Sequence, residues 1–193
     1  MIPLKTNNFN HMKTLAEHIL DIAQNSVRAK ATLIEIIVEE SKKSDLWTLT
    51  ITDNGCGMEE DMVKRATDPF FTSRTTRKVG LGLALLQQNT SAAGGTVRIK
   101  SKPGEGTVLK AEFQLSHIDR PPVGNIGETL YLLFLGYTTG ELQYEHKCEK
   151  GTFSIRSSEL HDALGEVPLQ NKEVRDGVIE LIKTNLEEIG ATK

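Results

Sequence analysis

The amino-acid sequence predicts an α+β protein in which helices cover one face of a sheet. Three observations support this class. A helical pattern of apolar residues occupies residues 11–29, two pairs of strand-like runs are each joined by a short polar turn, and helices alternate with these pairs rather than with single strands. The expected architecture is therefore a two-layer sandwich, followed by a small α+β extension at the C-terminus.

The first part of the pattern is a helix followed by a hairpin. Within residues 11–29, apolar side chains such as Leu15 and Ile19 recur at steps of three and four, which predicts an amphipathic helix with one buried stripe. Residues 33–40 are rich in β-branched side chains, and residues 46–52 alternate apolar side chains with threonine. The polar link between these two runs predicts a hairpin.

The second part places two helices before another hairpin. Glycine breaks and a stretch without clean periodicity separate the expected elements. These elements are a short helix at residues 59–66, a loop at 68–79, a helix at 83–93 that Gly80-Leu81-Gly82 opens, and strands at 96–101 and 107–115.

The C-terminal part contains enough periodic segments for a small module. Residues 127–136 are apolar and fit either a helix or a buried strand. Residues 141–148 and 152–157 alternate around a turn, which predicts a hairpin, and helices are expected at 157–164 and 171–189. These segments predict either a separate α+β module or an addition docked on the main sheet.

Charge divides the chain into two parts. Residues 1–120 carry 16 basic and 14 acidic side chains, whereas residues 121–193 carry 7 basic and 12 acidic ones. The change falls at Arg120-Pro121-Pro122, where paired prolines favour extended chain over helix. We therefore expect a main domain over residues 1–120 and an acidic extension over residues 121–193.

Composition excludes several classes of protein. The chain has 193 residues, 38% of them hydrophobic and 25% charged, which is typical of a soluble globular protein. Its longest apolar stretch, residues 130–137, is much shorter than the ~20 residues that span a bilayer, and the N-terminus has no secretory pattern. Two cysteines cannot form a disulfide framework, so we expect a cytoplasmic, reducing location. A net charge of −3 does not favour nucleic-acid binding.

Five short motifs occur in order and carry a family resemblance. They are Asp21-Ile-Ala-Gln-Asn25-Ser26, Asp53-Asn-Gly55-Cys-Gly57-Met, Asp68-Pro-Phe-Phe-Thr72-Ser-Arg, Gly80-Leu-Gly82-Leu and Gly104-Glu-Gly106-Thr107. Over residues 11–115 the chain resembles the GHKL superfamily of histidine kinases, type II topoisomerases, MutL-type mismatch-repair ATPases and the ninety-kilodalton heat-shock chaperone. It is most similar to the histidine-kinase ATP-binding domain. The resemblance implies the Bergerat fold, with helices on one face of a mixed sheet, and binding of ATP with Mg²⁺. No P-loop sequence occurs in the chain.

Two residues of the first motif are expected near the phosphates. The side-chain carbonyl of Asn25 is a hard oxygen donor, and the resemblance implies that Asn25 holds the Mg²⁺ that bridges the phosphates. Asp21 lies one helical turn earlier, where a carboxylate can orient or deprotonate an attacking water. Superfamily members that hydrolyse ATP usually carry Glu at this position, and many histidine kinases carry Asn. Asp21 departs from both patterns, so a catalytic role and a plain exposed helix position stay open.

The second motif is expected to recognise the base. Asp53 ends a strand, and a buried carboxylate there needs a hydrogen-bond donor, which the resemblance identifies as the adenine 6-amino group. Gly55 and Gly57 let the backbone approach the ring and adopt positive φ. The resemblance also implies that the Thr107 hydroxyl helps to hold Asp53 and a water, although a β-turn followed by a strand explains Thr107 almost as well. Cys56 is interpreted as a position that varies within the family.

Residues 68–79 are expected to form a lid over the phosphates, with a solvated basic loop as the alternative. The lid offers hydroxyl groups and cations, which suit a polyphosphate. The helix start that follows has free N–H groups for the α- and β-phosphates. The lid residues assigned to the ATP site are Thr72, Ser73, Arg74 and Lys78, with Arg74 or Lys78 facing the γ-phosphate, and the helix-start residues are Gly80, Leu81, Gly82 and Leu83.

The leading functional prediction is a Mg-ATP-binding protein that transfers the γ-phosphoryl group to His or Ser on a separate partner protein. His161-Asp162 resembles a phosphoacceptor dipeptide, but a plain surface histidine on a helix is favoured there. The alternative is an ATP-gated switch that orders its lid, forms a homodimer or captures a partner, and hydrolyses ATP slowly. A third possibility is nucleotide binding without turnover. Neither nucleic acid nor a membrane is expected as a partner.

Overall fold

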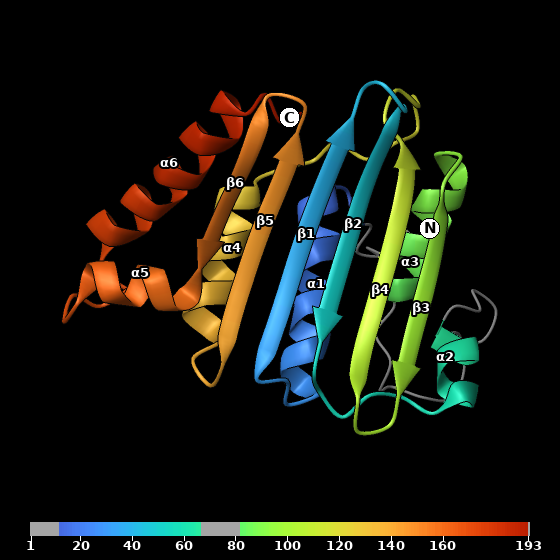
Figure 1. Cartoon of the computed structure of the whole chain (residues 1–193), viewed down its shortest axis with the longest axis horizontal. Coiled ribbons are helices and arrows are strands. Elements are labelled where there is room, and N and C mark those ends of the chain that lie inside the picture. The colour runs from blue at the N-terminus through green and yellow to red at the C-terminus, as the bar shows by residue number, and fades with distance from the viewer. Residues whose placement is uncertain (1–11, 67–81, 193) are drawn as a thin grey trace, which may run out of the picture.

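The computed structural model describes residues 12–66 and 82–192, which form one six-stranded sheet with helices packed mainly on one of its faces (Figure 1). The strands are β1 (Leu33–Ser41), β2 (Leu46–Asp53), β3 (Thr96–Lys102), β4 (Gly106–Gln114), β5 (Glu141–Cys148) and β6 (Gly151–Arg156). The helices are α1 (Leu15–Arg28), α2 (Glu60–Ala66), α3 (Gly82–Ala92), α4 (Ile126–Gly136), α5 (Ser157–Leu164) and α6 (Lys172–Glu188). Each of the predicted strands is confirmed to within about two residues.

The sheet is mixed, and its strand order is β3-β4-β2-β1-β5-β6. Four of the neighbouring pairs are antiparallel, whereas β1 and β5 run parallel, with Ile36 opposite Tyr144. A parallel pair needs a crossover, and here the chain between β1 and β5 includes β2, β3, β4 and α4. The predicted two-layer α+β architecture, with helices on one face of a mixed sheet, is therefore confirmed.

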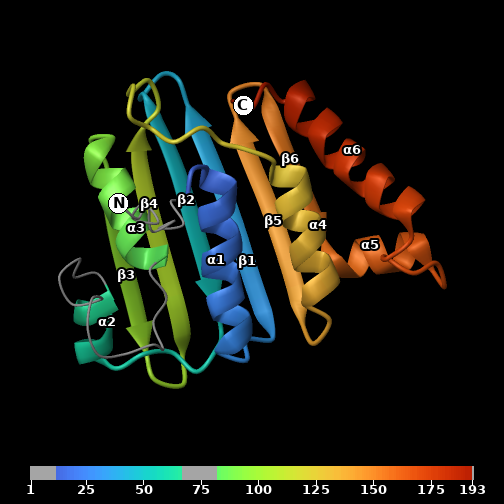
Figure 2. The same ribbon diagram turned by 180° about the vertical axis from the view of Figure 1, so that it is seen from behind.

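The segment after residue 120 continues the sheet. Strand β5 lies beside β1, and β6 forms the outer edge, so the C-terminal hairpin extends the sheet that β1–β4 begin. Seen from behind, α1 and α4 lie side by side across β1, β2 and β5 (Figure 2). The division into domains at residue 120 stays a prediction, and backbone hydrogen bonds cross it.

Helix α1 begins at Leu15 rather than near residue 11, because a capping box starts it there. The Thr14 hydroxyl accepts a hydrogen bond from the Glu17 amide, and the Glu17 carboxylate accepts one from the Thr14 amide. The amides of Leu15 and Ala16 donate to the carbonyls of Pro122 and Val123, so the linker after β4 also satisfies this helix start. Residues 12–14 are not helical.

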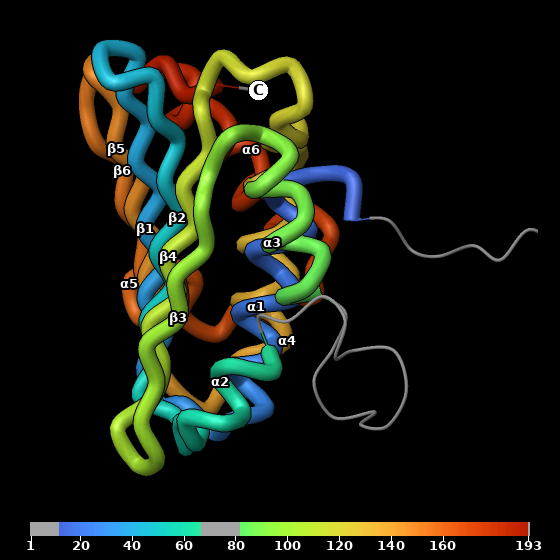
Figure 3. Tube along the Cα trace, turned by 90° about the vertical axis from the view of Figure 1, so that its right-hand side faces the viewer, coloured from blue at the N-terminus to red at the C-terminus, as the bar shows by residue number. Residues whose placement is uncertain are grey.

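An edge-on view shows the sheet and the helix layer as two layers (Figure 3), and the buried core residues lie between them. The apolar stripe of α1 packs on β-strand side chains, and the rings of Trp47 and Phe113 meet edge to face at 5.6 Å. The apolar segment at 127–136 is a helix, α4, which packs against both α1 and α6. Because α4 has neighbours on two sides, its sequence shows little amphipathic pattern. Within residues 12–66 and 82–192, no helix combines the length and apolar character that crossing a bilayer requires.

Candidate functional site

A cavity of about 250 Å³ opens at the C-terminal end of the interior strand β2, next to the last turns of α1. Its walls are largely apolar, with a few polar groups among them. The lining residues are Ile22, Asn25, Ser26, Arg28, Ala29, Ile51, Asp53, Cys56, Gly57, Met58, Met62, Leu83, Ile99, Thr107 and Leu109. An apolar pocket with few converging polar groups is the usual form of a small-molecule site.

Asp53, the last residue of β2, carries the buried carboxylate of this cavity. Its Oδ2 accepts a hydrogen bond of 2.7 Å from the Ser26 hydroxyl on α1, and its Oδ1 accepts one of 2.9 Å from the Gly55 amide. Only 8% of the Asp53 surface is exposed. A carboxylate has about four acceptor positions, so two remain for a donor on a ligand.

The turn after Asp53 is tied to the end of α1 and the start of β1. Asn54 Oδ1 accepts hydrogen bonds from the amides of Thr32 and Leu33, at 2.8 and 2.9 Å. The Cys56 amide donates to the carbonyl of Ala29 at 2.9 Å. These bonds hold the glycine-rich turn against α1, and they position the Asp53 carboxylate at the cavity.

Two glycines in this region are required by their surroundings. Gly57 has φ +65°, and a Cβ there would lie 2.0 Å from the carbonyl oxygen of Lys102. Gly106 has φ +98°, and a Cβ there would lie 1.9 Å from the carbonyl oxygen of Asp53. The second and last sequence motifs therefore meet in space, because the turn after β2 packs directly on the turn between β3 and β4.

Asn25 lies in the last turns of α1 and lines the same cavity as Asp53. Its side-chain oxygen accepts a hydrogen bond of 2.8 Å from Nη1 of Arg28. An amide oxygen has two lone pairs, so one remains for a cation or another donor. The structure thus brings together the two residues on which the nucleotide interpretation depends.

Asp21 lies one turn before Asn25, outside the lining of the cavity and against the start of α3. A Cβ on Gly82 would lie 1.8 Å from Asp21 Oδ2, so glycine is needed there for the two helices to approach. This Oδ2 is buried and has no hydrogen-bond partner among the described residues. Burial raises the pKa of Asp21, although the Arg28 charge and the Asn25 amide partly oppose this shift.

Thr107 lies opposite Asp53 in the pairing of β2 with β4 and lines the cavity. Its hydroxyl is 2.9 Å from the hydroxyl of Ser101. Ser101 in turn accepts a hydrogen bond from the Met58 amide and donates to the Gly106 carbonyl. The contact predicted between the Thr107 hydroxyl and Asp53 stays a prediction.

The remaining assigned residues divide into two groups. Leu83 lines the cavity, and Gly82 contacts Asp21. The other predicted phosphate-binding residues lie outside the described residues; they are Thr72, Ser73, Arg74, Lys78, Gly80 and Leu81.

Sequence reasoning missed the cavity walls and the Ser26 contact. Ile22 was expected on the buried stripe of α1, and it is buried, but it also faces the cavity. A helical or strand pattern cannot distinguish a side chain in the core from one that lines a pocket. Ser26 follows Asn25 in the first motif and lies one helical turn after Ile22. This spacing places Ser26 on the same face of α1 as Ile22, which was the available signal for its contact with Asp53.

Tyr137, in the C-terminal segment, contacts the loop between α1 and β1, next to the cavity. The Tyr137 hydroxyl, just after α4, donates a hydrogen bond of 2.8 Å to the carbonyl of Ala31. Burial raises the pKa of Tyr137, and the nearby carboxylates of Asp53 and Glu141 add to the shift. The loop between α1 and β1 therefore rests on residues that lie beyond residue 120.

The glycine contacts generate a first prediction. Gly57→Ala is expected to lower the free energy of unfolding by roughly 3 kcal/mol or more, because it adds a backbone clash to the ~1–2 kcal/mol cost of a left-handed side-chain residue. Gly104→Ala is the matched control, since Gly104 has φ +76° but no atom lies within 4 Å of its Cβ position. Urea unfolding measures both, and equal losses would contradict the contact with Lys102.

The environment of Asp21 generates a second prediction. Since its pKa is raised, the folded state binds this proton more tightly than the unfolded chain does, and the ionised carboxylate destabilises the fold above that pKa. Asp21→Asn is expected to raise Tm at pH 7 by about 2–4 °C. The gain should shrink as the pH falls through the raised pKa toward the ordinary value of about 3.9.

Thermal unfolding across this pH range measures the effect of Asp21→Asn. Asp162→Asn, on an exposed position of α5, is the control for the loss of one charge and should show no such gain. A stabilisation of Asp21→Asn that stays constant from pH 7 to pH 3.5 would argue against burial of the charge as its cause.

Comparison with known proteins identifies a family that matches the first part of the chain. The family described as "Histidine kinase-, DNA gyrase B-, and HSP90-like ATPase" matches residues 10–117. The signal transduction histidine-protein kinase AtoS of Escherichia coli is 38% identical over 96 residues, 49% of this chain and 16% of that protein. A putative sensor protein of Shewanella frigidimarina is 35% identical over 107 residues, 54% of this chain and 16% of that protein. The aligned part of the chain thus spans about one sixth of these relatives.

A solved structure shows the same fold. The crystal structure of the N-terminal domain of a DNA repair protein superposes with a TM-score of 0.52 at 14% identity, over 75% of this chain and 52% of that one. At this identity the likeness concerns the fold alone. The family match, in contrast, covers more than half of the sequence and includes the motifs that meet at the cavity. The chain therefore belongs to the family of histidine kinase-, DNA gyrase B- and HSP90-like ATPases.

Proposed function

We propose that the protein binds Mg-ATP in the cavity between Asn25 and Asp53 and transfers the γ-phosphoryl group to a His or Ser residue of a separate protein. The observation that carries this proposal is the shared cavity: the two side chains, from α1 and from the end of β2, line one space of about 250 Å³. The family to which the chain belongs supports ATP as the nucleotide.

The inner part of the cavity suits adenine. Apolar side chains such as Ile51 and Leu109 form its walls, and Asp53 supplies an acceptor that already has two protein donors. The 6-amino group of adenine is a hydrogen-bond donor, whereas the corresponding position of guanine is an acceptor oxygen. A carboxylate at this position therefore favours adenine over guanine.

The outer part of the cavity suits a magnesium-bound phosphate group. Mg²⁺ usually keeps several waters and takes few protein oxygens beside those of the substrate phosphates, so the single amide oxygen of Asn25 fits as its protein ligand. When bound, the ion would neutralise phosphate charge. The start of α3 at Gly82 adjoins Asp21 on this side, and a helix start offers unpaired amides to an anion.

In-line phosphoryl transfer needs mainly positioning and charge neutralisation, because the transferring group has little covalent chemistry that a protein must perform. In this proposal Asp53 fixes the base, Asn25 fixes the metal-bound phosphates, and the acceptor comes from a partner protein. His161, the histidine of the dipeptide that resembles a phosphoacceptor, lies on α5. The relatives include a protein named as a signal transduction histidine-protein kinase, which supports a kinase role.

The second candidate function is an ATP-gated switch, and Asp21 is the observation that favours it. Its buried Oδ2 has no hydrogen-bond partner among the described residues, and burial raises its pKa, as is common for a group that accepts a proton in catalysis. In this alternative Asp21 orients or deprotonates the water that attacks the γ-phosphate. Slow hydrolysis then resets a dimer or a partner complex.

Nucleotide binding is tested by thermal unfolding with and without Mg-ATP. We expect Mg-ATP to raise Tm, because a ligand present at 100 times its Kd stabilises the folded state by about 2.7 kcal/mol. GTP should give little shift, since its base presents an oxygen to Asp53. Asp53→Ala should abolish the shift, while Asp162→Ala, an exposed position on α5, should keep it. If Asp53→Ala remains folded by circular dichroism and its shift is unchanged, the adenine assignment is wrong.

Turnover separates kinase, switch and simple binding. The wild-type chain is incubated with γ-labelled ATP and candidate partner proteins, and both protein labelling and free phosphate are followed. Labelling of a partner supports the kinase, and phosphate release without labelling supports the switch. Asp21→Asn should keep the Tm shift in both cases, and should abolish phosphate release if Asp21 is the base. Binding with neither product identifies a nucleotide-binding protein without turnover.

A further inference from the structure

A group of three metal-type ligands lies at the other end of β1, away from the nucleotide cavity. Glu40, His146 and Cys148 place a carboxylate oxygen, a ring nitrogen and a thiol sulfur within 4.8 Å of one another. Glu40 and His146 are buried, and Cys148 is partly buried. The proposed function uses none of these residues.

Strand geometry explains why these three residues meet. His146 and Cys148 are two positions apart on β5, so their side chains leave the same face of the sheet. In the parallel pairing Val38 lies opposite His146 and Glu39 lies opposite Lys147, which brings the next residue, Glu40, beside Cys148. Val38 is fully buried on this face, so the group lies on the helix-covered side of the sheet.

The imidazole of His146 is held at both nitrogens. Its Nε2 is 2.9 Å from Glu40 Oε1, and its Nδ1 is 2.7 Å from the hydroxyl of the buried Tyr144. A histidine that binds a metal through one nitrogen typically hydrogen-bonds a fixed partner through the other, and this bond orients the ring. The Tyr144 hydroxyl, next to Nδ1, is placed to act as this partner if Nε2 binds the metal.

The group includes a buried carboxylate. Glu40 Oε1 lies 2.9 Å from Nε2 of His146, and the Glu40 carboxylate also accepts hydrogen bonds from the Thr192 amide. A divalent cation would neutralise the carboxylate and favour the thiolate, which is the metal-binding form of cysteine.

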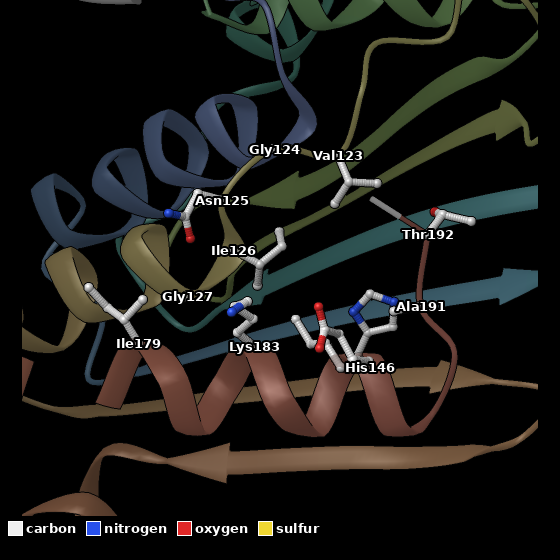
Figure 4. A pocket seen from close by; sticks show the side chains of 12 residues that line it. Val123, Gly124, Asn125, Ile126, Gly127, His146, Ile179, Lys183, Ala191 and Thr192 are labelled. Carbon is white, nitrogen blue, oxygen red and sulfur yellow. The ribbon is translucent and has the colours of Figure 1, made fainter. Parts of the chain in front are cut away.

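His146 also faces a cavity of about 320 Å³ between the start of α4, α6 and the C-terminal residues (Figure 4). Lys183, Ala191 and Thr192 line this cavity with His146. The Thr192 hydroxyl oxygen is buried and has no hydrogen-bond partner among the described residues. The cavity offers room for a water or another ligand next to His146.

We propose that Glu40, His146 and Cys148 bind a divalent transition-metal ion of the zinc type, with a fourth position open toward this cavity. One sulfur, one imidazole nitrogen and one carboxylate oxygen form a donor set that suits zinc, and thiolate selects it over Mg²⁺ and Ca²⁺. On binding, a metal–sulfur bond replaces the S–H bond of Cys148, and the thiol proton leaves to solvent. The proton of His146 then resides on Nδ1, toward Tyr144, so that Nε2 can coordinate.

The site would join two parts of the chain. Glu40 lies within residues 10–117, which match the ATPase family, whereas His146 and Cys148 lie on the C-terminal hairpin. Glu40 also accepts hydrogen bonds from the amide of Thr192, close to the C-terminus. A bound ion would therefore link β1 to β5, and through Glu40 it would also link both strands to the C-terminal residues around Thr192.

Cobalt titration of the metal-free 193-residue chain tests the proposal. We expect one equivalent of Co²⁺ to produce a thiolate-to-cobalt charge-transfer absorption, which Zn²⁺ then removes. Cys148→Ser should lose this absorption. Cys56→Ser is the matched control and should keep it, since Cys56 is the other cysteine of the chain and lies at the nucleotide cavity. No absorption in the wild-type chain, or loss in Cys56→Ser instead of Cys148→Ser, would overturn the site.

A second measurement uses the wild-type chain alone, so it does not depend on whether a variant folds. Zn²⁺ is expected to protect Cys148 of the wild-type chain from a maleimide reagent, while the exposed Cys56 reacts at the same rate with and without zinc. Mass spectrometry of the peptides reads both cysteines in one sample. Equal modification of Cys148 with and without zinc would reject the proposal.

Tyr144→Phe separates a positioning role of the hydroxyl from a merely structural one. It should weaken the Co²⁺ affinity ~10–100-fold while circular dichroism shows an intact fold. An unchanged affinity would remove Tyr144 from the site. None of these measurements involves ATP, so their outcome is independent of the proposed function.

Discussion

The position of the Asp53 carboxylate depends on one packing constraint, the close contact between the turn after β2 and its two neighbours. On one side, Asn54 ties the turn to the start of β1. On the other side, Gly57 and Gly106 bring backbone against backbone at distances that no side chain permits. These contacts fix the backbone at Asp53, and the hydrogen bonds from Ser26 and Gly55 then hold its carboxylate in place. A preorganised acceptor of this kind binds a ligand without first losing conformational entropy.

The C-terminal segment takes part in this arrangement. Strand β5 lies beside β1 in the interior of the sheet, so β1 has hydrogen-bonded neighbours on both sides. Tyr137 supports the loop that leads from α1 to β1. The region that matches the ATPase family therefore does not contain all the contacts that hold its own cavity, and residues beyond 120 supply some of them.

The two candidate sites lie at opposite ends of β1. Ile34, near the start of this strand, pairs with Asp53 at the nucleotide cavity, while Glu40 belongs to the proposed metal site. Six residues of extended chain separate them by about 20 Å. Strand β1 connects the two sites, but no side chain belongs to both of them. Binding at one site is thus chemically separate from binding at the other.

Most elements of this protein could be predicted from local patterns. The helix of residues 15–28, the hairpins and the glycine-rich breaks each follow from periodicity or from turn chemistry, which depend on neighbours in sequence. The motif residues Asn25 and Asp53 were identified as one site because their order resembles a known family. The start of α1 was wrong by about four residues, since its cap depends on Thr14 and on a linker more than one hundred residues away.

The tertiary structure alone decided what depends on contacts between distant segments. Apolar residues 127–136 fitted a helix or a strand equally well, and packing between α1 and α6 settled the helix. Likewise, no sequence pattern could join Glu40 to His146, because the parallel register of β1 and β5 brings together residues that are 106 positions apart. Local sequence determines which elements form, whereas strand order and register determine which side chains meet.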